Sequence, residues 1–242
     1  RPRPYTSAVP KPLARAVADL LYPLRCAGCG AFDTALCQPC EAALQPATGP
    51  GRCGHCSAAW DGTEFCPRCF HLQHIARIHA AFEMTGPARR LVHRLKYSYY
   101  TALAPVMARL LRDSLPSIEA SASFAVPLHP SRLKERGFNQ SELLLRQALA
   151  SAPAPGLLRT RRTDRQVGQH FAARRTNIGG AFAYRGPSLR GQTVVLVDDV
   201  VTTGATVSEC ATALLDAGAR EVHVVAFARA SYDTTSTAPI ED

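Results

Sequence analysis

One segment, VVLVDDVVTTGATV at residues 194–207, constrains the fold of this chain more than any other. A run of apolar residues leads directly into two adjacent carboxylates, Asp198 and Asp199, and then into a threonine-rich turn around Gly204. The residues after the turn have the apolar periodicity of a helix, and the next apolar run, VHVVAFA at 222–228, has the composition of a strand. A strand, a helix and a strand in this order predict a parallel sheet with a right-handed crossover.

The chain between residue 75 and this segment shows the same alternation. IHAAFEM (78–84) and FAVPL (124–128) have the composition of buried strands. Three other segments carry apolar residues every three or four positions, as helices do: LVHRLK (91–96), LAPVMARLLRDSL (103–115) and SELLLRQALA (141–150). We therefore expect an α/β fold whose parallel sheet is flanked by helices. Its ligands should bind beyond the carboxyl ends of the strands, in the loops after FAVPL, around 160–177 and after VVLVDD.

The turn after the acidic pair is suited to a phosphate group. Gly204 permits a tight turn, so successive backbone N–H groups converge at a helix N-terminus, where the helix dipole adds positive potential. The turn is not a Walker motif, because it contains no GxxxxGK[ST] pattern. Two carboxylates beside a phosphate would repel it unless they serve another group. A ribose diol can donate hydrogen bonds to them, directly or with a hydrated magnesium ion nearby, which indicates a ribose 5-phosphate ligand.

Eight of the nine cysteines form four CxxC pairs: Cys26 and Cys29, Cys37 and Cys40, Cys53 and Cys56, Cys66 and Cys69. Eight thiolates are the ligand count of two tetrahedral zinc sites, and sites closed by four thiolates are structural. We favour zinc over disulfides because the chain has the character of a cytosolic protein. The spacing permits either sequential pairing of the CxxC motifs or a crossed pairing, first with third and second with fourth. His55, His71 and His74 are expected to be bystanders.

The overall composition favours an anionic partner. The formal net charge is +9, mostly from arginine, whose planar fork suits bidentate contacts to phosphate. No apolar run approaches the roughly 20 residues of a membrane span, and the first residues lack the apolar core of a secretory signal. We therefore expect a cytoplasmic protein. KPLARAVADLLYPL, at residues 11–24, has the pattern of an amphipathic helix leading into the first cysteine pair.

The acidic pair followed by TTGAT resembles the PRPP-binding signature of type I phosphoribosyltransferases. Together with the CxxC module, PLHPSRLKERGFNQ and RTDRQVGQHFAARRTNIGGAF, the chain resembles the ComF family of competence proteins, also called GntX-like. The resemblance implies a type I phosphoribosyltransferase-like (Rossmann-like) parallel sheet flanked by helices, with a small N-terminal zinc module. The expected division is an N-terminal helix at 1–24, a double zinc ribbon-like module at 25–74, a phosphoribosyltransferase-like domain at 75–230 and a disordered tail at 231–242.

The resemblance also implies roles for individual residues. Asp198 and Asp199 would hold the ribose hydroxyls. The 5-phosphate would be wrapped by the turn, that is by Val201, Thr202, Thr203, Gly204, Ala205 and Thr206. The cationic residues expected to grip pyrophosphate are Arg132, Lys134 and Arg136, and those of a mobile hood are Arg162, Arg165 and Gln166. Together with magnesium, such cations would stabilise the charge that develops on departing pyrophosphate, and no general base stands out.

Two functions follow from the resemblance. One is a magnesium-dependent phosphoribosyltransferase, linked to DNA uptake in natural competence, whose acceptor the sequence does not identify. The other is a non-catalytic competence protein that handles single-stranded DNA and uses the transferase fold as a scaffold or PRPP sensor. In the second case, DNA and proteins of the import machinery would be the partners, and contacts to DNA would come from the arginines at 159–175 and from Tyr97, Tyr99 and Tyr100. For these tyrosines, packing is the competing interpretation.

Overall fold

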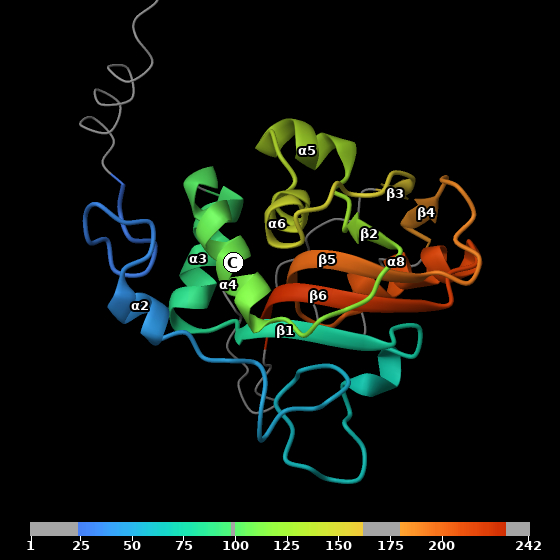
Figure 1. Ribbon diagram of the computed structural model, residues 1–242, viewed down its shortest axis with the longest axis horizontal. Coiled ribbons are helices and arrows are strands. Elements are labelled where there is room, and N and C mark those ends of the chain that lie inside the picture. Colours follow the sequence, from blue (N-terminus) through green and yellow to red (C-terminus); the bar gives the residue numbers. More distant parts are fainter. Residues whose placement is uncertain (1–23, 98–99, 162–179, 231–242) are drawn as a thin grey trace, which may run out of the picture.

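The computed structural model describes residues 24–97, 100–161 and 180–230, and its centre is a four-stranded parallel sheet. The strand order is β1-β6-β5-β2 (Figure 1), and the strands are β1 Arg77–Glu83, β2 Ala122–Ala125, β5 Thr193–Val201 and β6 Glu221–Arg229. In the central pair, Leu196 stands beside Val224. Both central strands are apolar on both faces, which is characteristic of a parallel sheet covered on both sides.

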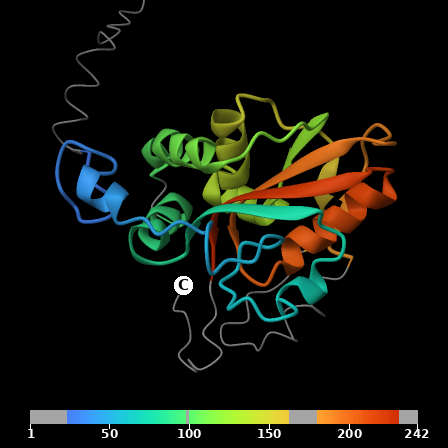
Figure 2. The ribbon, with the colours of Figure 1, turned by 60° about the horizontal axis from the view of Figure 1, so that its bottom comes forward.

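Alternate side chains of β5 pack into two separate cores. Val195 and Val197 point to the layer of helices α3 Gly86–Tyr97, α4 Ala104–Ser114 and α6 Gln140–Ala148. Val194 and Leu196 point to helix α8 Ala205–Asp216 and to a small antiparallel sheet of β3 Leu157–Arg159 and β4 Phe182–Tyr184. Figure 2 shows α4 and α8 on opposite sides of the sheet. The expected α/β architecture is therefore confirmed.

The cysteine-rich segment is divided between these two cores. Its first part, which contains the short helix α2 Gln38–Ala42, packs Leu36 and Leu44 into the core of α3 and α4. Its second part includes the 3-10 turn η1 Cys69–His71, and Leu72 and Ile75, which follow this turn, pack into the core of α8. Between them the chain passes the edge of the sheet, where the Ala47 N–H donates to the Ala81 carbonyl of β1.

Two expected boundaries differ from the structure. The strand expected at 124–128 ends at Ala125, because Pro127 has no N–H with which to continue the ladder. The loop expected after it contains helix α5 Pro130–Arg136, which begins at a proline and whose first turn is capped by the His129 side chain. A second 3-10 turn, η2 Thr101–Leu103, leads into α4. The expected N-terminal helix and C-terminal tail lie outside the described residues, apart from Leu24.

None of the helices in the described part of the chain has both the length and the apolar character needed to cross a membrane.

Candidate functional site

The acidic pair lies near the carboxyl end of β5 and is almost completely buried. Asp198 is 8% exposed and Asp199 is 2% exposed. The Asp198 Oδ1 atom accepts two hydrogen bonds, from the Ser141 hydroxyl at 2.9 Å and from the Asp199 backbone N–H at 2.9 Å. The Lys96 ammonium on α3 lies 2.9 Å from Asp199 Oδ2. Three segments far apart in the sequence therefore meet at the pair.

Burial and the neighbouring charges shift the pKa values of Asp198 and Lys96. Burial, and next the adjacent Asp199 charge, raise the pKa of Asp198 to about 7, although Lys96 and the Ser141 hydrogen bond oppose the shift. Burial alone would lower the pKa of Lys96, but the attraction of Asp199 outweighs it and raises that pKa. Asp198 therefore keeps its proton to a higher pH than an ordinary carboxyl does, while Lys96 stays charged. The site can take up or release a proton when a ligand binds.

Sequence reasoning missed Lys96. Its side chain is 22% exposed, and it follows Val92 and Leu95, two buried residues of α3, at spacings of four and one. A cation on the apolar stripe of an amphipathic helix was the available signal, because such a residue requires a buried partner of opposite charge. The partner is about 100 residues away in the chain, so the sequence alone could not name it.

The segment PSRLKERGFNQ holds Ser141 in place. Helix α5 ends at Gly137, whose positive φ of 75° reverses the chain direction. Asn139 then caps α6: its Oδ1 accepts from the Ser141 backbone N–H at 3.0 Å, and its Nδ2 donates to the Val126 carbonyl at 3.0 Å. The cap fixes the start of α6 against the end of β2, which places the Ser141 hydroxyl on Asp198.

The three cations expected to grip pyrophosphate all lie on helix α5, in different surroundings. Arg132 is half-buried and lies near Arg159 of β3, whose pKa is lowered first by burial and next by the Arg132 charge. Arg136 Nη1 donates to Gln140 at 2.7 Å, and its guanidinium lies 5.6 Å from the centre of the Tyr97 ring. Lys134 is exposed. Arg132 and Arg159 together favour an anion near the acidic pair, whereas the hood residues Arg162, Arg165 and Gln166 lie outside the described residues.

The threonine loop, residues 201–206, connects β5 to α8. Val201 ends the strand, and Gly204 stands at the N-cap of α8 with φ of 86°, a conformation that only glycine adopts without strain. Thr203 Oγ1 accepts a weak hydrogen bond from the Ala205 N–H at 3.3 Å. Because glycine has no side chain, α8 has no side-chain cap, and the N–H groups of its first turn face the loop. The loop thus forms a backbone cradle beside the two carboxylates.

The eight paired cysteines form two groups, and the motifs pair sequentially. The first zinc site consists of Cys26, Cys29, Cys37 and Cys40, and the second of Cys53, Cys56, Cys66 and Cys69. A tetrahedral site with Zn–S bonds of about 2.3 Å places its sulfurs about 3.8 Å apart. Within each group all the sulfurs lie within 4.8 Å of one another, and the shorter contacts include 3.4 Å between Cys53 and Cys69 and 3.8 Å between Cys56 and Cys66. The residues therefore fit two zinc ions.

The thiols of the first site differ: the surroundings of Cys26 favour its thiolate, whereas burial raises the pKa of Cys40. Burial alone would raise the pKa of Cys26, but hydrogen bonds from backbone N–H groups, including those of Cys37 and Gly28, lower it to about 6. In the second site, His55 Nδ1 lies 3.3 Å from Cys69 Sγ, and its Nε2 lies 2.8 Å from the Ile75 carbonyl oxygen. His55 therefore contacts a zinc ligand but does not belong to the group of four cysteines.

Comparison with known families identifies two domains in the chain. Residues 121–239 match the phosphoribosyl transferase domain, and residues 17–70 match the double zinc ribbon domain. The first match covers the sheet strands β2, β5 and β6 with the acidic pair and the threonine loop. The second match covers both groups of cysteines, and it supports zinc as the metal that they bind.

Individual relatives lead to the same family. The chain is 35% identical over 162 residues to the DNA utilization protein YhgH of Escherichia coli K12, covering 61% of this chain and 70% of the relative. It is 30% identical over 193 residues to competence protein F of Haemophilus influenzae (74% and 84%), and 26% identical over 203 residues to competence protein ComFC of Streptococcus pneumoniae (81% and 89%). With its phosphoribosyl transferase and double zinc ribbon domains, the chain belongs to the ComF family of competence proteins.

Proposed function

We propose that the chain binds PRPP at the carboxyl end of β5 and transfers its phosphoribosyl group, in the cytoplasm, as part of DNA uptake in natural competence. The observation that supports this most strongly is the buried acidic pair beside an uncapped helix N-terminus. Burying two adjacent carboxylates is costly, so a fold retains them where they have a partner to bind. Among the described residues, Lys96 forms an ion pair with Asp199, and no cation forms an ion pair with Asp198.

The two halves of a ribose 5-phosphate fit the two halves of this site. The N–H groups at the start of α8 and the hydroxyls of the threonine loop would donate to the phosphate oxygens. The carboxylates of Asp198 and Asp199 would accept hydrogen bonds from the ribose 2- and 3-hydroxyls. Lys96 keeps the net charge of the pair low, so that a polyanionic ligand can approach it.

Pyrophosphate would lie on the side of α5 and β3. Arg132 and Arg159 are close enough to influence each other's charge, and an anion between them would relieve their repulsion. In the transfer, the bond between ribose C1 and the pyrophosphate oxygen breaks, its electron pair leaves with pyrophosphate, and a nitrogen of the acceptor bonds to C1 and loses its proton to solvent. The arginines would stabilise the charge that grows on the leaving group.

A magnesium ion bound with PRPP fits the same site. Carboxylate oxygens are ligands that Mg²⁺ prefers, and the Lys96 ammonium against Asp199 shows that the pair already holds a cation. Asp198 and Asp199 are the described residues that would hold the ion, directly or through water. Bound there, Mg²⁺ would neutralise charge on the pyrophosphate oxygens and favour their departure.

Phosphorus NMR of PRPP tests the transfer directly. The zinc-loaded chain, Mg²⁺ and PRPP are incubated with a panel of purine, pyrimidine and pyridine bases, and pyrophosphate release is followed. We expect one class of base to accelerate release, Asp199→Asn to abolish the acceleration, and Glu142→Gln, a change of an exposed acid on α6, to leave it intact. If no base accelerates release although PRPP binds, the site is a sensor and not a transferase.

A second candidate function is supported by the distribution of basic residues. We propose that exposed cations of α3 and α5, namely Arg89, Arg90 and Lys134, contact single-stranded DNA. The net charge of +9 and the relative named DNA utilization protein both agree with such a role. Anisotropy of a labelled oligonucleotide should then show affinity that falls steeply with salt. In this case Asp199→Asn leaves DNA affinity unchanged. Replacing the three cations by Gln makes the affinity fall less steeply with salt concentration.

A further inference from the structure

The side chain of Arg229, the last residue of β6, joins the second zinc site to the threonine loop. Arg229 is 1% exposed. Its Nε donates to the Cys56 carbonyl at 2.9 Å. Its Nη1 donates to the Val201 carbonyl at 3.0 Å and also to the Thr202 carbonyl. One planar guanidinium therefore holds the backbone of a zinc ligand and the first two residues of the loop at the same time.

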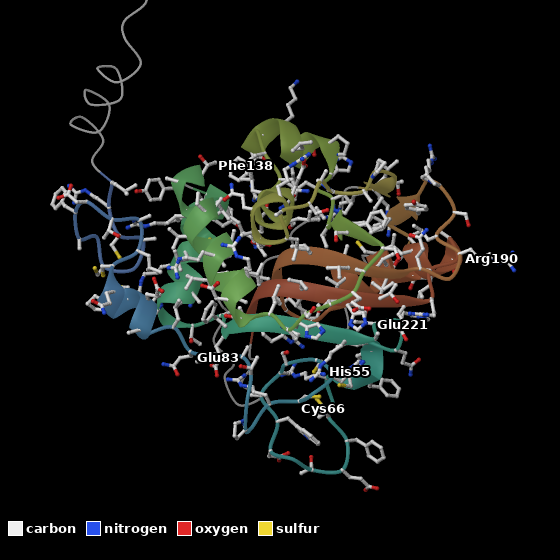
Figure 3. All side chains as sticks on the ribbon, in the orientation of Figure 1. His55, Cys66, Glu83, Phe138, Arg190 and Glu221 are labelled. Atoms are coloured by element: carbon white, nitrogen blue, oxygen red, sulfur yellow. The ribbon has the colours of Figure 1, made fainter. Side chains whose placement is uncertain are left out.

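Two further contacts join the same parts of the molecule. The Ser208 hydroxyl on α8 donates to the His71 carbonyl, just after the second zinc site, at 3.0 Å. Leu72 packs so closely on Gly204 that a Cβ added there would collide with Leu72 Cδ2. Figure 3 shows His55 and Cys66 of the second site in the segment that lies along β1. The threonine loop thus rests on the zinc-bound segment, and its conformation depends on that support.

The charge of the second site suits a buried guanidinium. Four thiolates around Zn²⁺ leave a net charge of about −2 on the site. Among the described residues, no carboxylate forms an ion pair with Arg229, whereas its Nε contacts the backbone of Cys56, one of these ligands. Zinc bound there would therefore favour the positive charge of the guanidinium that holds the loop.

Within residues 24–97, 100–161 and 180–230, the first zinc site makes no such connection to the threonine loop. It packs on the opposite face of the sheet, in the core of α3 and α4, and Glu41 beside it pairs with Arg109 of α4 at 2.7 Å. Cys26 and Cys40 belong to this core, whereas Cys53 and Cys56 belong to the core of α8 and Val201. The two zinc sites of one chain therefore differ in a way that supplies an internal control.

We infer that Arg229 is a positioning residue that couples the second zinc site to the threonine loop, so that zinc at Cys53, Cys56, Cys66 and Cys69 and a phosphate ligand on the loop strengthen each other's binding. Coupling of this kind is reciprocal by thermodynamic necessity. The coupling between site and loop follows from contacts within the chain. Its consequence for ligand affinity rests on the proposed PRPP function.

Hydrogen exchange without ligand tests the coupling itself. Arg229→Lys keeps a positive charge but removes the planar guanidinium that contacts both the Cys56 carbonyl and the threonine loop. Compared with wild type, it should speed amide exchange about tenfold or more in two segments, 53–69 and 202–208, and leave 26–40 unchanged. Arg190→Lys, the same change at an exposed position far from the site (Figure 3), should alter none of them. Unchanged exchange in 202–208, or equal acceleration in all three segments, would overturn the inference.

A milder variant covers the case in which Arg229→Lys does not fold. Ser208→Ala removes one hydrogen bond to the His71 carbonyl and should accelerate exchange in the same two segments by about fivefold, the equivalent of one ordinary hydrogen bond. Acceleration confined to α8, with 53–69 unaffected, would contradict the coupling. Mass spectrometry under native conditions checks that each variant still carries two zinc ions.

The ligand experiment separates this inference from the proposed function. Calorimetric titration with PRPP and Mg²⁺ should show binding to wild type that weakens at least tenfold in Arg229→Lys. In wild type, PRPP should slow the loss of one of the two zinc ions to a chelator, and in Arg229→Lys it should slow neither. Failure of wild type to bind PRPP refutes the proposed function, while the exchange data still decide the coupling. Equal PRPP affinity of both proteins refutes the coupling.

Discussion

Replacing Asp198 by Asn should stabilise the protein while abolishing PRPP binding. Asp198 is 8% exposed and its pKa is raised to about 7, mainly by burial. Its ionised form is therefore penalised in the folded state. An asparagine has nearly the same shape, and its Oδ1 can still accept from the Ser141 hydroxyl and the Asp199 N–H. The variant keeps these contacts and loses the buried charge.

The expected change in stability follows from the shift in the pKa of Asp198. From an ordinary value of 3.8 to about 7, the pKa of Asp198 rises by about three units, which corresponds to roughly 4 kcal/mol. Between pH 3.8 and about pH 7, Asp198 is protonated in the folded state and ionised in the unfolded state. The free energy of unfolding therefore falls as pH rises and is lowest above pH 7. We expect Asp198→Asn to gain about 1–3 kcal/mol at pH 8, because the new amide N–H groups need partners of their own.

Urea unfolding of the zinc-loaded protein at pH 6 and pH 8 measures this effect. Wild type should lose about 1.4 kcal/mol between these pH values relative to Asp198→Asn, since only wild type has the titrating carboxyl. Asp199→Asn is the matched comparison: it leaves the half-buried Lys96 without its partner and should destabilise the protein by about 3 kcal/mol. A less stable Asp198→Asn at pH 8, with the pH dependence of wild type retained, would refute this reasoning.

Three further predictions concern stability and are measured by urea unfolding with both zinc ions bound. Lys96→Met should destabilise the protein by about 3 kcal/mol, because it leaves the buried Asp199 carboxylate unpaired, and a loss within the error of the measurement would contradict the ion pair. Glu41→Gln should change stability by less than about 1 kcal/mol, because the Glu41–Arg109 pair is largely exposed, and a larger loss would show that it is more than a surface pair. Gly204→Ala should cost about 1–3 kcal/mol, because its φ is positive and the added methyl meets Leu72, and an unchanged midpoint would argue against this loop conformation.

The regular parts of the fold could be predicted because their signals are local. The apolar run before Asp198 and the helical pattern after Gly204 determine a strand and a helix within 25 residues, and the structure confirms β5 and α8 there. Eight cysteines in four pairs indicate two metal sites by number alone. The domain boundaries and the roles of individual site residues remain predictions.

Other features depend on contacts that no local pattern contains. The pairing of the CxxC motifs is sequential because the first two motifs pack in one core and the last two in the other. Within the first group, for example, the Cys37 N–H donates a hydrogen bond to Cys26 Sγ. Helix α5 replaces the expected loop because Pro130 and Gly137 suit its two ends. Lys96 is a cation on the apolar face of α3 and Arg229 is a buried cation at the end of β6, and their importance appears only when their partners, about 100 and 170 residues away in the sequence, are placed beside them.

Calorimetric titration of the zinc-loaded protein with PRPP in the presence of Mg²⁺ tests the central claim most directly. The account predicts saturable one-site binding in the range of about 1 µM to 1 mM, common for enzyme substrates, that is lost in the Asp198→Ala/Asp199→Ala double variant and kept in Glu142→Gln. Equal binding by wild type and the double variant would place PRPP elsewhere. The absence of any heat of binding in wild type, under conditions in which both zinc ions are retained, would contradict the proposal that the acidic pair and the threonine loop form a PRPP site.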